Sequence, residues 1–220
     1  YVAEFRCSAI LSRLKKMTDW KPLLSDLSEV VMSLESFDES MLQFYGVPEL
    51  TDADRESKWL GFPPASEAQI GETESRLGIK LPPSLRDFYL VSNGWRQISD
   101  FVYEIVPVEK LNWIREVDPE FCELVEDSFD LPDLEYCREE NETAVLRSVC
   151  LAQKGDATTL LIDPENQTEN GEWIVGAWAS WHPGIEWSGV GFADFMTQTL
   201  EECRELHSET EGEHGEALKP

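Results

Sequence analysis

The sequence contains no run approaching the roughly 18–20 uncharged apolar residues that a membrane-spanning helix requires. Its first seventeen residues also lack an uninterrupted apolar block, because charged side chains such as Arg6 and Arg13 divide them. They therefore do not have the pattern of a secretory signal. These absences predict a cytoplasmic protein with no membrane partner.

Metal ligands and catalytic nucleophiles are sparse and scattered. The histidines (His182, His207 and His214) lie far apart or in the acidic tail, and none pairs with a cysteine at metal-ligand spacing. The five cysteines are odd in number, and no two have the close spacing of a metal or redox motif. There is no nucleophile elbow and no glycine loop that would cradle a phosphate. The sequence therefore predicts reduced thiols, no metal, no cofactor and no enzyme activity.

Basic residues are few: 18 Lys and Arg stand against 44 Asp and Glu, which gives a formal net charge of -26. The excess is uneven, because residues 111–220 contain 26 acids and 6 bases. Such a field repels nucleic-acid phosphates and anionic membranes, and it speeds encounters with basic surfaces. Direct nucleic-acid binding is therefore disfavoured. Two interpretations stay open: the acidity guides a basic partner, or it only keeps the protein in solution.

Apolar residues recur at helical spacing in two stretches near the start of the chain. The first spans residues 2–17, and the second begins after Asp19, a candidate N-cap. A polar stretch, residues 48–55, then predicts a connector. We therefore expect three parts: a helical extension (1–55), a main domain (56–206) and an acidic disordered tail (207–220).

The segment "PPASEAQIGETESRLGIKLPPSLRDFYLVSNGW", residues 63–95, gives the clearest local prediction. Ser66 and Gln69 form a capping-box pattern at the start of a helix, and Gly78 can adopt the left-handed conformation that ends it. Ser84 is expected to cap a short helix that follows the two prolines. The residues assigned to this structural motif are Gly78, Pro82, Pro83, Asn93, Gly94 and Trp95.

Beyond Trp95 the apolar period changes from helical to alternating, which predicts strands. Residues 163–166 (DPEN) predict a turn, and apolar spacing over 192–206 predicts a closing amphipathic helix. The predicted strands cover residues 101–106, 147–152, 158–162 and 173–178, with a hairpin turn between the second and the third. Helices followed by strands and then a helix imply an α+β fold with a mainly antiparallel sheet.

This succession resembles the SUKH superfamily over residues 57–205. The specific part is the "LGIKLPPSLRDFYLVSNGW" segment, and "LLIDPENQTENGEWIVGAW" and "GFADFMTQTL" follow in the expected order. The resemblance implies a bent, mostly antiparallel sheet flanked by helices, with no catalytic residue set. Bacterial members look like immunity proteins that bind a cognate toxin, often a nuclease or deaminase. Fungal members look like regulatory scaffolds in cell-wall synthesis.

Residues 116–142 contain twelve acids and one base, Arg138. We expect an acidic excursion with a short helix in it. It is either a solvated loop or a carboxylate surface that imitates nucleic-acid phosphate in the groove of a basic toxin. The candidate partner-binding acids are Glu116, Glu120, Glu123, Glu126, Asp127, Asp130 and Asp133.

Four tryptophans fall within the fifteen residues from Trp173 to Trp187. They either fill the core and cover a sheet edge or, for Trp181, His182 and Trp187, form binding anchors on an exposed loop, because tryptophan is enriched at interface hot spots. The leading hypothesis is an immunity protein that neutralises a basic, nuclease-type toxin domain by direct binding. The alternative is a regulatory or scaffold module of the cell-wall-synthesis type. The sequence leaves the oligomeric state open.

Overall fold

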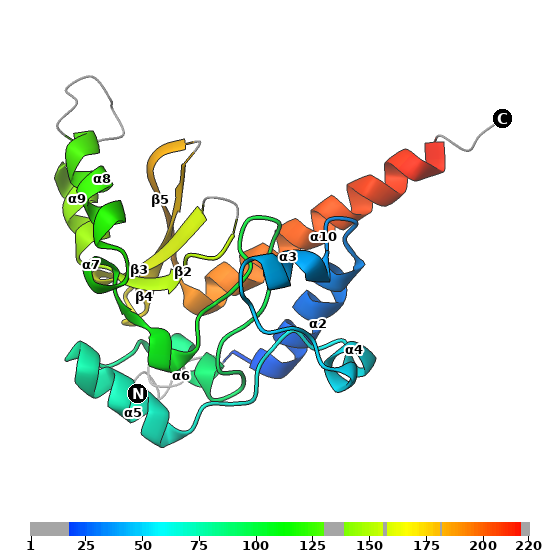
Figure 1. Cartoon of the computed structure of the whole chain (residues 1–220), viewed down its shortest axis with the longest axis horizontal. Helices are drawn as coiled ribbons and strands as arrows, with labels where there is room; N and C mark the ends of the chain where they lie inside the picture. Colours follow the sequence, from blue (N-terminus) through cyan, green and yellow to red (C-terminus); the bar gives the residue numbers. More distant parts are fainter. Residues whose placement is uncertain (1–17, 130–138, 156–157, 181, 217–220) are drawn as a thin grey trace, which may run out of the picture.

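The computed structural model describes residues 18–129, 139–155, 158–180 and 182–216 (Figure 1). Within these residues, five strands form one antiparallel sheet in which each strand pairs with the strand before it. The sheet is therefore a meander with its first and last strands at the edges. The strands are β1 (Asn112–Trp113), β2 (Val149–Ala152), β3 (Thr158–Gln167), β4 (Trp173–Ala179) and β5 (His182–Gly191).

Helices precede, interrupt and close this sheet, which confirms the predicted α+β class. In chain order they are α2 (Trp20–Ser33), α3 (Glu39–Phe44), α4 (Asp52–Ser57), α5 (Glu67–Leu77), α6 (Pro83–Tyr89), the short 3-10 helix η1 (Val108–Lys110), α7 (Ile114–Val117), α8 (Pro119–Phe129), α9 (Glu139–Leu146) and α10 (Phe192–Glu216).

The two faces of the sheet bury different hydrophobic clusters. On β3, Leu160 and Ile162 pack into the larger cluster, to which α2, α5, α6 and α10 contribute. Leu161 lies between them and packs into a smaller cluster under α8 and α9. This split follows from the period of two along a strand. We call the Leu160 side the inner face and the Leu161 side the outer face. Figure 1 shows α8 and α9 on one side of the sheet and α10 on the other.

The predicted motif around α5 and α6 is confirmed at its first turn. Ser66 and Gln69 form the reciprocal capping box, and Gly78 ends α5 with a φ of 75°. The prediction that Ser84 caps α6 is wrong, because α6 begins at Pro83, with Pro82 as its N-cap residue. The backbone N and hydroxyl of Ser84 instead donate to the carboxylate of Glu172, at 3.2 and 2.7 Å. The side chain of Glu172, 88 residues away, thus accepts a hydrogen bond from a backbone N–H at the start of this helix.

The Asn93-Gly94 pair fixes the exit from α6. Asn93 Oδ1 accepts a hydrogen bond from the backbone N of Val108 at 2.8 Å. Gly94 has a φ of 93°, and a Cβ there would lie 2.7 Å from the carbonyl oxygen of Ile105. Only glycine fits both the conformation and the close approach. Trp95 is then fully buried in the larger cluster.

The strand predicted over residues 101–106 is wrong. This segment forms only isolated bridges, one of them between Trp95 and Ile105. Its backbone donors have different partners: Tyr103 donates to the carbonyl of Lys154, and Ile105 donates to that of Trp95. Because these donors pair with different segments of the chain, no continuous ladder forms. The alternation of apolar residues reflected burial rather than strand pairing.

Strands β2, β3 and β4 confirm the predicted hairpin and the strand after it. The turn predicted at residues 163–166 is wrong, because β3 continues to Gln167 with an irregular register after Asp163. The chain turns at residues 168–171 instead, where Gly171 has a φ of 75° and donates to the carbonyl of Thr168.

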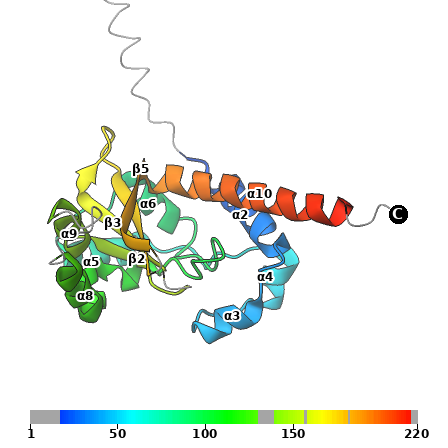
Figure 2. The ribbon, with the colours of Figure 1, turned by 90° about the horizontal axis from the view of Figure 1, so that it is seen from above.

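The first and last helices that the structure describes lie against each other. Figure 2 shows α2 alongside the first turns of α10. The ring of Trp20 packs against those of Phe88 and Phe192, with centroid distances of 5.4 and 5.7 Å. The second predicted N-terminal helix is α2, while the first, residues 2–17, lies outside the described residues. The predicted connector, residues 48–55, overlaps α4, which a Thr51–Asp54 capping box starts. Where a disordered tail was predicted after residue 206, α10 continues to Glu216.

Candidate partner-binding site

The described part of the acidic segment between β1 and β2 forms three helices, α7, α8 and α9, where one short helix was expected. Asp118 Oδ1 accepts a hydrogen bond from the backbone N of Phe121 at 2.9 Å, and Pro119 occupies the first position of α8. Cys122 and Val125 are buried in the cluster on the outer face. The ring of Phe121 meets that of Trp178 on β4 edge-on, with centroids 5.4 Å apart. One apolar stripe of α8 therefore packs against the sheet.

The opposite stripe of α8 is acidic. Glu120, Glu123 and Asp127 follow a spacing of three and four residues, which places them on one face of a helix. All three are exposed, as is Glu116 on α7. Leu124 lies in the same stripe and is 58% exposed. We call the exposed side of α7 and α8 the acidic platform.

A basic residue lies beside this platform. Arg115 pairs with Glu126 at 3.0 Å, and both side chains are about half exposed. The pair offsets the charge of Glu126 and leaves the carboxylates of the α8 stripe directed toward solvent. Two further predicted acids, Asp130 and Asp133, lie outside the described residues.

The outcome differs among the candidates Trp181, His182 and Trp187. Trp181 lies outside the described residues, and His182 is the first residue of β5. Trp187 is half-buried on β5 and packs against the outer cluster. A Cβ on Gly176 of β4 would lie 2.6 Å from the Trp187 ring, so glycine makes room for that indole. The structure therefore brings Trp187 to the same face of the sheet as the acidic platform.

A buried ion pair that the sequence did not reveal joins the end of α9 to β3. Arg147 binds Asp163 through two nitrogens, at 2.9 and 2.7 Å, and the Asp163 side chain is 0% exposed. The hydrogen bond to Asp163 raises the pKa of Arg147. This pair anchors the acidic helices to the sheet. The Asp-Pro at residues 163–164 suggested only a turn, and the partner of the Asp came from outside that motif.

The described thiols have little nucleophilic character. Burial raises the pKa of Cys150 to about 12 and that of Cys203 to about 11. Burial also raises the pKa of Cys122. All three therefore stay protonated at neutral pH, and the thiolate is the reactive form. Within the described ranges, no group of three or more His, Cys, Asp or Glu side chains is placed to hold a metal ion.

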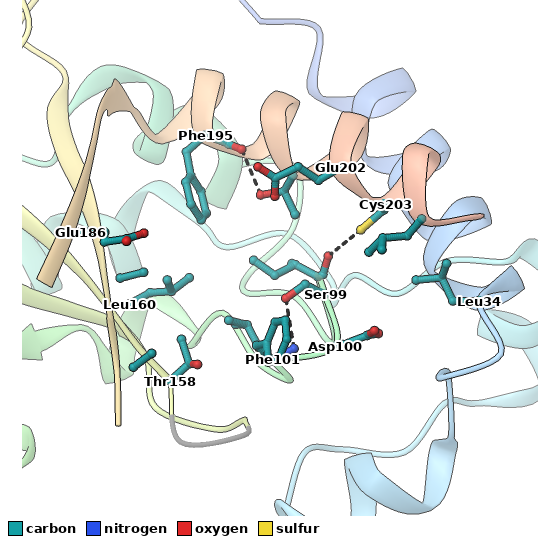
Figure 3. A pocket seen from close by; sticks show the side chains of 16 residues that line it. Leu34, Ser99, Asp100, Phe101, Thr158, Leu160, Glu186, Phe195, Glu202 and Cys203 are labelled. Atoms are coloured by element: carbon teal, nitrogen blue, oxygen red, sulfur yellow. Dashed lines mark hydrogen bonds between the residues drawn. The ribbon is translucent and has the colours of Figure 1, made fainter. Parts of the chain in front are cut away.

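A concave site on the inner face was also not predicted from the sequence. A cavity of about 410 Å³ lies between α10, the loop of residues 98–102 and the strands β3 to β5 (Figure 3). Its lining comes from segments more than a hundred residues apart, and no local motif marks it.

The model of the SMI1 / KNR4 family (SUKH-1) matches residues 64–198, which is more than half of the chain. The match begins just before α5 and ends within α10, so it includes the whole sheet and the acidic platform. No curated protein matches the chain. In the part of the chain that the structure describes, no helix has both the length and the apolar character needed to cross a membrane.

Proposed function

Because this chain belongs to the SMI1 / KNR4 family (SUKH-1), we propose that it is a non-enzymatic, cytoplasmic immunity protein that neutralises a basic toxin domain by binding it. The family supports an immunity-type or regulatory domain. The observation that carries the finer proposal is the acidic platform. Its carboxylates are exposed, while the opposite side of the same helix is fastened to the sheet.

The proposed mechanism is occupation of the partner without turnover. The packed helix holds the backbone of these acids in place before binding, so the entropy lost when a basic surface meets them is that of the side chains alone. The net charge of -26 adds a long-range attraction that speeds the encounter. A nuclease-type toxin suits this surface best, because its groove is shaped and charged for phosphates.

The test compares two full-length variants with the same loss of charge. One neutralises the platform with Glu116→Gln, Glu120→Gln and Glu123→Gln. The other neutralises exposed acids elsewhere with Glu56→Gln, Glu72→Gln and Glu201→Gln. Each is used to capture partners from cells of the native host and is co-expressed with the candidate toxins recovered.

We expect the wild type and the control to retain a basic partner and to protect cells, and the platform variant to lose both. If no toxin-like partner is recovered and no candidate toxin is neutralised, the immunity proposal fails. If both variants protect equally, the platform is not the binding surface.

The second candidate is a regulatory scaffold of the cell-wall-synthesis type. The helices α2 to α4 lie outside the matched residues, and Phe44 on α3 is 77% exposed. An additional surface of this kind suits a domain with more than one partner. Capture of several partners, of which one is lost on Phe44→Ser and another on the platform changes, would favour this function over toxin neutralisation.

A further inference from the structure

The cavity on the inner face has a floor of small side chains. Ala177 and Ala179 on β4 pair in register with Leu160 and Thr158 on β3, and all four line the cavity. Because the alanine side chains are short, the floor of the cavity lies close to the backbone of the sheet. The part of α10 that follows Phe195 forms one wall, and the loop of residues 98–102 forms the other (Figure 3). A volume of about 410 Å³ lies toward the small end of the range of roughly 300–1,000 Å³ for ligand sites.

Apolar side chains line most of this cavity and extend to its mouth. Ile98, Val102 and Phe195 line its walls. Phe101 and Leu206 also line it, and they are 50% and 49% exposed. Large apolar side chains with this much exposure beside a hollow are typical of a binding surface.

Carboxylates accompany this apolar lining. Asp100, Glu186 and Glu202 line the cavity, from the loop, β5 and α10 respectively (Figure 3). The lining residues that the structure describes include no Lys, Arg or His. Asp100 accepts a hydrogen bond from the Ser36 hydroxyl at 2.6 Å, and Glu202 forms no ion pair with any described residue. After burial, the charges of Asp100 and Glu202 are what raise the pKa of Cys203, which agrees with a negative potential inside the cavity.

We propose that this cavity binds a short peptide segment of a partner protein, with an apolar side chain seated over Ala177 and a Lys or Arg against the carboxylate of Glu202. Charge complementarity selects this occupant, because the lining offers acceptors for a cation and none of the described lining side chains is a cation that would receive an anion. The cavity lies on the inner face, opposite the acidic platform, so the inference does not depend on the proposed function.

The test uses the full-length chain and three fluorescein-labelled peptides of about ten residues, a length that spans such a groove. One contains Lys, Leu and Ser; the second replaces every Lys with Glu; the third replaces every Leu with Ser. Fluorescence anisotropy measures their binding. We expect the first peptide to bind at least roughly tenfold more tightly than either of the others. Equal binding of the Lys and Glu peptides, or binding of none, overturns the proposal.

Matched variants then locate the binding. Glu202→Lys reverses a charge inside the cavity, and Glu201→Lys makes the same change at the neighbouring exposed residue, which does not line it. We expect Glu202→Lys to weaken peptide binding roughly tenfold and Glu201→Lys to weaken it less than about twofold. Ala177→Leu, which fills the floor, should also weaken binding roughly tenfold. Equal effects of the two charge reversals would place the binding elsewhere and overturn the proposal.

Two other occupants are outcomes of the same test. Residues 1–17 contain four bases and one acid. If the full-length Lys15→Glu, Lys16→Glu variant binds the Lys-Leu-Ser peptide roughly tenfold more tightly, residues 1–17 of the chain compete for the cavity, and its assignment to a partner protein is overturned. If the chain self-associates in sedimentation and Glu202→Lys abolishes this, the occupant is a second copy, which likewise overturns the assignment to a partner.

Discussion

The inner and outer faces of the sheet come from the same strands but are covered in different ways. The inner face lies under large aromatic side chains in mutual contact, such as Phe88 and Phe192 with ring centroids 5.1 Å apart. The outer face lies under a smaller cluster, to which α8 contributes Phe121, Cys122 and Val125 while its other side is acidic. Stability and charge are thus separated: buried clusters on both faces hold the fold, and we expect the exposed carboxylates of the outer layer to contribute little to it.

The largest expected effect is at the inner cluster. Phe192→Ala should lower the free energy of unfolding by about 3–5 kcal/mol, because it removes a fully buried ring and leaves a cavity. Urea unfolding followed by circular dichroism measures it. Phe44→Ala, at an exposed site, is the control and should change the value by less than about 1 kcal/mol. Comparable losses for the two variants would break the assignment of the inner face as the main core.

The outer cluster should come next. Leu161→Ala is expected to lower the free energy of unfolding by about 3 kcal/mol, because this side chain is fully buried under the acidic helices. Leu124→Ala on the exposed side of α8 should cost no more than about 0.5 kcal/mol. A loss below about 1 kcal/mol for Leu161→Ala would mean that α7 to α9 do not bury the outer face.

A smaller loss is expected at the buried ion pair. Arg147→Gln leaves the carboxylate of Asp163 buried without its cation, which should cost about 2 kcal/mol after allowing for the 33% exposure of the arginine. Arg115→Gln is the matched control, because its pair with Glu126 lies at the surface. The same denaturation assay should show a change below about 0.5 kcal/mol for the control. If both variants lose the same, the pair does not anchor the helices.

The smallest effect on stability should come from the platform. Glu120→Gln with Glu123→Gln should change the free energy of unfolding by less than about 0.5 kcal/mol, because both side chains are exposed. Thermal unfolding by calorimetry checks it. A loss above about 1 kcal/mol would show that the carboxylates serve the fold and would remove the separation between the two faces.

The local structure could be predicted where one short segment determines it. The capping box at Ser66, the left-handed Gly78 and the hairpin between β2 and β3 all depend on neighbours in the sequence. The strand β5 could not, because Pro183 and three glycines lower its strand propensity. As an edge strand it pairs only with β4 among the described residues, which makes such residues tolerable.

Contacts between distant residues account for what the sequence left hidden. Glu172 satisfies the start of α6, and Arg147 binds Asp163. Arg96 is buried because it donates to backbone carbonyls such as those of Pro48 and Gly61, at 2.9 and 3.0 Å. The platform could be predicted in part. The acids were evident in the sequence, but the apolar stripe at Phe121, Cys122 and Val125 that packs their helix against the sheet was not predicted. The inner cavity required the packed structure.

The salt dependence of association tests the central claim most directly. The rate at which the chain binds its captured basic partner is measured by stopped-flow fluorescence from about 0.05 to about 0.5 M salt, over which the Debye length shrinks to a few ångströms. If carboxylates guide the encounter, the rate falls steeply for the wild type and less steeply for the variant with Glu116→Gln, Glu120→Gln and Glu123→Gln. A rate that stays flat for the wild type across this range would contradict the account.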